Sequence, residues 1–122
     1  MQERSPTISI NTALKSGLGI LYPSTDETGH CSAASLEKSI HSLAENGCSV
    51  IALSFRDLAA DHAVQAGILV MCQQIAGKLG RKLLVIKENK TVMHSLVDLC
   101  FFFGIELHES LEECLNHQPI GA

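Results

Sequence analysis

The chain has 122 residues, of which 46% are hydrophobic and 18% charged, and its formal net charge is −4 at pH 7. This balance is typical of one globular domain with a well-filled core, and an acidic charge without a basic stripe excludes nucleic acid as the main partner. No apolar run is long enough to cross a membrane and the first residues lack the apolar segment of a signal peptide, so we expect a cytoplasmic protein without direct membrane insertion.

The first third of the chain predicts a strand pair and a helix. Residues 7–14 alternate apolar and polar side chains, as a half-buried strand does. Residues 18–22 follow a tight-turn sequence, which predicts a second strand that pairs back on the first at one edge of a sheet. After a polar loop, residues Ala33–Glu45 carry apolar side chains at helical spacing, with Ser32 in position to cap the helix and Asn46-Gly47 to end it.

The middle of the chain predicts a βαβ unit. Residues 50–53 form an apolar run typical of a strand buried on both faces, and residues 83–86 form a second one. Between them, a spacing of three and four predicts one buried helical stripe, which consists of Val64, Ile68, Met71, Cys72, Ile75 and Leu79. Gln65 falls on another face of this helix, and Gly80 suits the left-handed residue that ends it. The two strands should therefore be parallel, with a right-handed crossover.

The last third predicts a helix, an edge strand and a short terminal helix. The helix runs over residues 91–103, and its buried face consists of Val92, Leu96, Leu99 and Phe103. Residues 105–107 are long enough for an edge strand only. Ser110-Leu111-Glu112-Glu113 has the serine and the glutamate of a capping box, which opens a helix through Leu115. Residues 116–122 should fray.

Together these elements predict an α/β fold. We expect one domain over residues 1–122, with an ordered core at residues 6–115 and no internal linker. The strands should form a single-layer mixed sheet of four or five strands, and about four helices should pack mainly on one of its faces.

The cysteines do not indicate a disulfide framework or a metal site. Their number is five, which is odd, and they never form a Cys-x-x-Cys pair. Three of them fall in helical patterns, where a thiol acts as a small apolar filler: Cys72, Cys100 and Cys114. His30 and Cys31 are adjacent, but a metal ion would need two further ligands. We therefore expect no metal ion and no cofactor.

Catalysis has little support in the sequence. Asp57, Asp61 and His62 could meet in space and perform acid–base work. However, the serines, histidines and aspartates follow no recognisable catalytic order, no cysteine lies beside a plausible base, and no pair of carboxylates marks a cleft. We expect a protein that is not an enzyme.

The order and spacing of the elements resemble the STAS domain, the module of anti-sigma factor antagonists and of the cytoplasmic tails of sulfate transporters. Residues 50–53 match the buried strand of that family, and Asp61-His62-Ala63-Val64 falls on its Asp-Ser-Ser/Thr-Gly turn. From there the spacing continues without a gap to the strand at 83–86, and residues 110–115 resemble the closing helix. The match is good over residues 47–115 and weaker before them. The resemblance implies a STAS-like fold and a non-enzymatic regulatory module.

The sequence departs from the family at the turn. In anti-sigma factor antagonists the first serine after the aspartate is phosphorylated by a partner kinase, which switches binding off. Here His62 replaces that serine and Ala63 takes the next position, so we expect no phosphorylation at the family position. A register that sets Gly67 on the family glycine leaves Gln65 and Ala66 there, with the same result.

The resemblance also implies a binding surface. The turn and the helix after it would contact the partner through Asp61, His62, Ala63, Val64 and Gln65. Asp61 is also explained as a plain helix N-cap, whose removal costs ~1 kcal/mol. The implied partner is an anti-sigma factor or related kinase, in the regulation of transcription. The alternatives are a cytoplasmic STAS subunit of a lipid or anion transporter, which would contact the transporter ATPase, and a STAS domain that senses a small ligand.

A second candidate surface is apolar. Phe101, Phe102 and Phe103 are consecutive, and a helix cannot bury three neighbours against one face. Leu69 and Val70 pose the same problem on the central helix. Either these side chains pack against a neighbouring helix, or Leu69, Val70, Phe101 and Phe102 form an interface for a partner or for a second copy of the chain.

Overall fold

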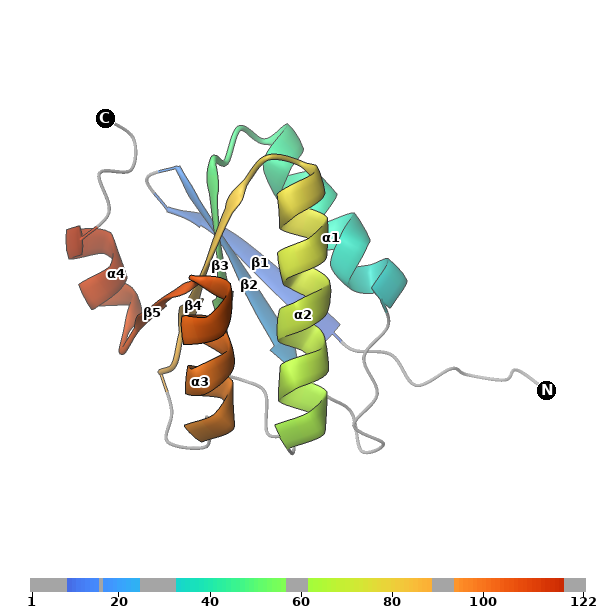
Figure 1. The fold of residues 1–122 in the computed structure, drawn as a ribbon. Coiled ribbons are helices and arrows are strands. Elements are labelled where there is room, and N and C mark those ends of the chain that lie inside the picture. The colour runs from blue at the N-terminus through green and yellow to red at the C-terminus, as the bar shows by residue number, and fades with distance from the viewer. Residues whose placement is uncertain (1–8, 16, 25–32, 57–61, 89–93, 118–122) are drawn as a thin grey trace.

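The computed structural model describes residues 9–15, 17–24, 33–56, 62–88 and 94–117 (Figure 1). Its elements follow in the order β1 (Ser9–Lys15), β2 (Leu18–Ser24), α1 (Ala33–Glu45), β3 (Val50–Ser54), α2 (His62–Lys78), β4 (Lys82–Ile86), α3 (His94–Phe103), β5 (Glu106–His108) and α4 (Leu111–His117). Three segments that the sequence predicts lie outside the described residues: the start of β1 at 7–8, the start of α3 at 91–93 and the tail at 118–122. α4 continues to His117, which is two residues beyond the predicted end of this helix at Leu115.

The strands form one mixed sheet in chain order (Figure 1). β1 pairs antiparallel with β2, and the pairs β2–β3, β3–β4 and β4–β5 are parallel. The register of β3 and β4, from Val50 opposite Lys82 to Ser54 opposite Ile86, confirms the parallel βαβ unit. Gly80 follows α2 with a φ of 68°, as predicted for the residue that ends this helix. β1 and β5 lie at the two edges, also as predicted.

Both faces of the sheet are covered. α1, α2 and α3 lie on one face (Figure 1), and α4 packs on the other. Side chains alternate along the strands, so Leu53 and Val85 belong to the cluster under the three helices, whereas Ala52 and Leu84 belong to the cluster under α4. This confirms a mixed sheet with its helices mainly on one face. Within the described part of the chain, no helix is both long and apolar enough to cross a membrane.

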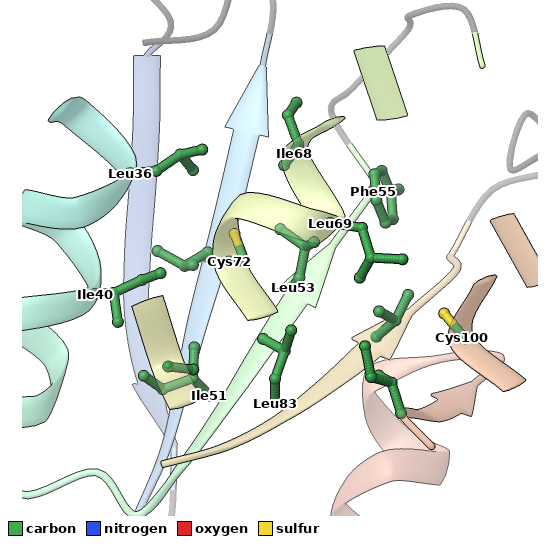
Figure 2. Close-up of a cluster of buried hydrophobic side chains, with 14 of the residues drawn as sticks. Leu36, Ile40, Ile51, Leu53, Phe55, Ile68, Leu69, Cys72, Leu83 and Cys100 are labelled. Carbon is green, nitrogen blue, oxygen red and sulfur yellow. The ribbon is translucent and has the colours of Figure 1, made fainter. Parts of the chain in front are cut away.

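The larger core cluster joins the three helices to the sheet. Figure 2 shows its buried side chains between them, with labels on Leu36, Ile40, Ile51, Leu53, Phe55, Ile68, Leu69, Cys72, Leu83 and Cys100. α2 contributes the centre of this cluster, because it contacts α1, α3, β3 and β4. Its position explains why so much of the helix is buried.

Two predicted buried faces need correction. On α2, Gln65 and Leu69 are fully buried, although the periodicity placed Gln65 on another face. The buried face is wider than the predicted stripe, because helices flank α2 on both sides. On α3, Phe103 was predicted to be in the core but is 37% exposed, and Cys100 is buried in its place.

The end of α3 decides where its last side chains point. The N–H of Gly104 donates to the carbonyl of Phe101 (3.2 Å), and the N–H of Ile105 donates to the carbonyl of Cys100 (2.8 Å). These two bonds form a Schellman motif, and the φ of 70° at Gly104 is one that glycine adopts without strain. Cys100 and Ile105 are both buried in the larger cluster. Phe101 and Phe102, which follow Cys100 directly, therefore point away from the core.

The capping box of α4 forms with one difference from the prediction. Ser110 Oγ accepts from the N–H of Glu113 at 3.1 Å, as expected for a capping serine. The Glu113 carboxylate reaches back past Ser110 and accepts from the N–H of Glu109 at 2.9 Å. Both bonds still satisfy backbone donors at the start of the helix.

Candidate functional site

The predicted partner-binding segment follows β3, at the carboxyl ends of the parallel strands, where binding sites of α/β folds commonly lie. Asp57 and Asp61 lie outside the described residues, and His62 is the first residue of α2. Ala63 is exposed, and Val64 is partly buried against the larger core cluster. The structure places Gln65 in the core rather than on the predicted surface. Of the residues in this segment whose burial is described, Ala63 is therefore the exposed one.

The chain that leads from β3 toward this segment is held by several contacts. The N–H of Phe55 donates to the carbonyl of Ile86 (3.2 Å), and the Phe55 side chain is fully buried. The N–H of Arg56 donates to Ser54 Oγ (3.2 Å). The guanidinium carbon of Arg56 lies 4.0 Å from the centroid of the Tyr22 ring, which is a cation–π distance. These contacts fix the point at which the chain leaves the sheet.

Glu88 joins three elements at the same end of the sheet. Its Oε1 accepts from Ser54 Oγ at the end of β3 (3.1 Å), and its Oε2 accepts from the N–H of Leu111 at the start of α4 (3.2 Å). Its φ of 55° lies in the left-handed region, which costs a side-chain-bearing residue roughly 1–2 kcal/mol. A strained backbone persists where the surroundings over-determine it. No local sequence pattern indicates Glu88, because its partners Ser54 and Leu111 lie far away in the chain.

A charged cluster joins β4, β5 and α4, and the sequence did not indicate it. His108 is buried, with Nε2 3.2 Å from Glu106 Oε1 and Nδ1 3.5 Å from Glu113 Oε1. Lys82 Nζ donates to Glu106 Oε2 at 2.6 Å. Among the described residues, no three His, Cys, Asp or Glu side chains are grouped so that they could hold a metal ion. The cluster attaches the start of α4 to the edge of the sheet.

The described cysteines are buried thiols: Cys48, Cys72, Cys100 and Cys114. Burial raises the pKa of Cys100 to about 11. Burial also raises the pKa of Cys48, against the opposing charge of Arg81, and the pKa of Cys114. A buried, protonated thiol packs as a small apolar group and reacts slowly, which agrees with the filler role predicted for the helical cysteines. His30 and Cys31 lie outside the described residues.

The second candidate surface lies at the end of α3. Phe101 is 88% exposed, Phe102 is 80% exposed, and the rings of Phe102 and Phe103 meet edge to face with centroids 5.4 Å apart. We call Phe101, Phe102 and Phe103 the aromatic patch. Of the two alternatives for Leu69, the structure shows packing in the core, because Leu69 is fully buried in the larger core cluster, and Val70 is partly buried. Among the described residues of α2 and α3, the exposed large apolar side chains therefore all belong to α3.

No protein-family model and no curated protein matches the sequence. Among solved structures, the chain is similar to the anti-sigma factor antagonist SpoIIAA in its unphosphorylated form, with a TM-score of 0.55 and 10% sequence identity. The match covers 89% of this chain and 94% of that chain. At this identity the likeness concerns the fold. The chain is an α/β domain that shares the STAS-like fold of SpoIIAA over most of its length.

Proposed function

We propose that the protein is a non-enzymatic regulatory module that binds a protein partner through the turn before α2 and the first residues of that helix. The observation that carries the proposal is the fold match to an anti-sigma factor antagonist, which covers 89% of this chain and 94% of the other. The sequence at the start of α2 supports it, because Asp61-His62-Ala63-Val64 resembles in its position the binding turn of anti-sigma factor antagonists. The proposed partner is an anti-sigma factor or related kinase.

The proposed module is not switched by serine phosphorylation at the family position. His62 and Ala63 stand there, and neither side chain carries a hydroxyl. Ser54 is close in sequence, but it is fully buried and its hydroxyl is hydrogen-bonded to Glu88, so a kinase has no access to it in the folded state. Binding would then be controlled by partner concentration or by a different signal.

The proposal is tested with a pair of matched substitutions. Ala63 and Ala34 are both exposed, and each is the second residue of its helix. Ala63→Arg places a long charged side chain on the proposed surface, whereas Ala34→Arg makes the same change on α1. The partner is first identified by affinity capture of the tagged full chain from native lysate, and it is then purified for titration calorimetry.

We expect Ala63→Arg to weaken binding of the captured partner at least tenfold, which is about 1.4 kcal/mol, while Ala34→Arg leaves the affinity unchanged. Equal affinities for Ala63→Arg and the wild type would refute the proposed surface. Capture of a transporter ATPase instead of an anti-sigma factor or kinase would favour the alternative of a transporter subunit. A thermal shift produced by a nucleotide or a lipid would favour the small-ligand alternative.

A further inference from the structure

The aromatic patch contains three of the four large apolar side chains that are exposed in the described part of the chain. Phe101, Phe102 and Phe103 are 88%, 80% and 37% exposed, which amounts to about two whole side chains. At about 200 Å² for each phenylalanine, the patch offers roughly 400 Å² of apolar surface. The largest apolar patches of monomeric proteins are of this size and are often functional.

The fold forces this exposure. The Schellman motif at Gly104 directs Cys100 and Ile105 into the core, and Leu96, one turn before Cys100, is fully buried as well. The inward positions at this end of α3 are thus occupied, and neither Phe101 nor Phe102 can turn inward without unfolding the helix end. The edge-to-face contact between Phe102 and Phe103 joins these two rings into one continuous apolar surface.

The character of the patch favours a second copy of this chain as its partner. Interfaces between proteins that also exist apart are about as apolar as ordinary surface, whereas homodimer interfaces are more apolar. Three adjacent aromatic residues belong to the second type. Each side of a standard interface buries about 800 Å², so the patch would supply about half of that as an apolar centre. Val97, which is partly buried, and Asp98, which is exposed, lie one turn earlier on α3 and would form part of the rim.

We propose that the aromatic patch is the centre of a two-fold symmetric homodimer, in which α3 packs antiparallel on α3 of a second copy. A two-fold interface uses the same surface on both copies, so the phenylalanines of one copy meet those of the other. The antiparallel arrangement is favoured because it places the two Asp98 side chains at opposite ends of the contact, where like charges are separated and hydrated.

The dimer leaves the proposed partner surface accessible. α2 and α3 lie side by side and both begin at the lower end of the view in Figure 1. The aromatic patch lies at the end of α3, whereas Ala63 lies at the start of α2. The two surfaces are therefore at opposite ends of this pair of helices (Figure 1). Dimerisation and partner binding are therefore separate properties, and one can fail without the other.

The test is sedimentation equilibrium of the full chain over a range of concentrations. We expect the wild type to be a dimer, and the double variant Phe101→Ser/Phe102→Ser to dissociate with a Kd raised at least about a hundredfold, because central aromatic residues carry most of the binding energy of an interface. Both positions are exposed, so the variant should keep the circular dichroism spectrum and the urea midpoint of the wild type. Leu14→Ser is the matched control, because Leu14 is also a large exposed apolar residue (51%) but lies on β1.

The outcomes are distinct. A dimer in the wild type and in Leu14→Ser, together with a monomeric double variant, supports the proposal. A monomeric wild type at every concentration overturns it, as does a double variant that dimerises as tightly as the wild type. Association that continues beyond the dimer as concentration rises also overturns it, because a two-fold contact is closed.

Discussion

Glu88 offers the sharpest test of how the fold holds the end of β3 and the start of α4. Its carboxylate accepts hydrogen bonds from Ser54 Oγ and from the N–H of Leu111, and its backbone has a φ of 55°. The two features act in opposite directions, because the hydrogen bonds stabilise the fold and the backbone strain destabilises it. Substitutions that remove one feature or both can therefore separate the two effects.

The magnitudes follow from the contacts. Hydrogen bonds to charged groups contribute roughly 1.5–3 kcal/mol each, and these two are only partly buried, so Glu88→Ala should lose about 3 kcal/mol of unfolding free energy. Glu88→Gly loses the same bonds but relieves the left-handed strain, which should return about 1 kcal/mol. Glu88→Gln keeps one side-chain acceptor, so we expect a loss of about 1.5 kcal/mol. The expected order of stability is wild type, Gln, Gly and Ala.

The assay is urea unfolding of the full chain, followed by far-ultraviolet circular dichroism and compared at equal m-values. Glu45→Ala serves as the control, because Glu45 is an exposed glutamate at the end of α1 and its loss should change stability by less than about 0.5 kcal/mol. If Glu88→Ala were as stable as this control, the carboxylate would contribute nothing. If Glu88→Gly were less stable than Glu88→Ala, the strain argument would be wrong.

Three further predictions concern the core and use the same unfolding assay. Gly19→Ala should lower the free energy of unfolding by about 1–3 kcal/mol, because the new Cβ would lie 2.8 Å from Cys48 Sγ. Gly77→Ala should raise it by about 0.5–1 kcal/mol, because nothing lies within 4 Å of the new Cβ. Changes of the same sign in the two variants would contradict this reasoning. Leu69→Ala should lose about 2–5 kcal/mol, and a loss typical of a surface site would contradict its burial. The contribution of Cys100 to stability should be constant below the usual pKa of a cysteine, 9.0, and should fall as the pH rises to about 11, because its thiol ionises first in the unfolded chain. Cys100→Ala should flatten that fall, and an unchanged slope would contradict the assignment.

Local signals in the sequence predicted most of the elements. The bounds of α1, Ala33–Glu45, were found because the Asn-Gly that ends this helix lies next to it in the sequence. The βαβ unit was found because β3 and β4 are apolar runs bounded by polar residues. The buried face of α2 was predicted only in part, because the helix is apolar on several sides and its neighbours decide which of them is covered. That information is not contained in the periodicity of one helix.

The candidate site was less predictable, because its contacts join residues far apart in the chain. Glu88 lies 34 residues from Ser54 and 23 from Leu111, so no local pattern could indicate the bridge. Helical geometry predicted that three consecutive phenylalanines cannot all face the core, but it left open whether the others are exposed or packed on a neighbouring helix. The choice of Cys100 over Phe103 for the core depends on the turn at Gly104. A glycine followed by an apolar residue, as in Gly104-Ile105, is typical of a Schellman motif. Applied to the sequence, that pattern would have predicted Cys100 instead of Phe103 as the buried residue.

The order of the strands in the sheet has a consequence for synthesis of the protein. In the described sheet each strand pairs with the one made just before it, and no strand has to enter between two that are already paired. The chain can therefore fold in step with translation, from the amino end onward. A nascent chain that ends after α2 already contains three neighbouring strands and two of the helices that cover them. Each later segment then adds to an existing edge, which limits the time that an unpaired strand is exposed to other chains on the polysome.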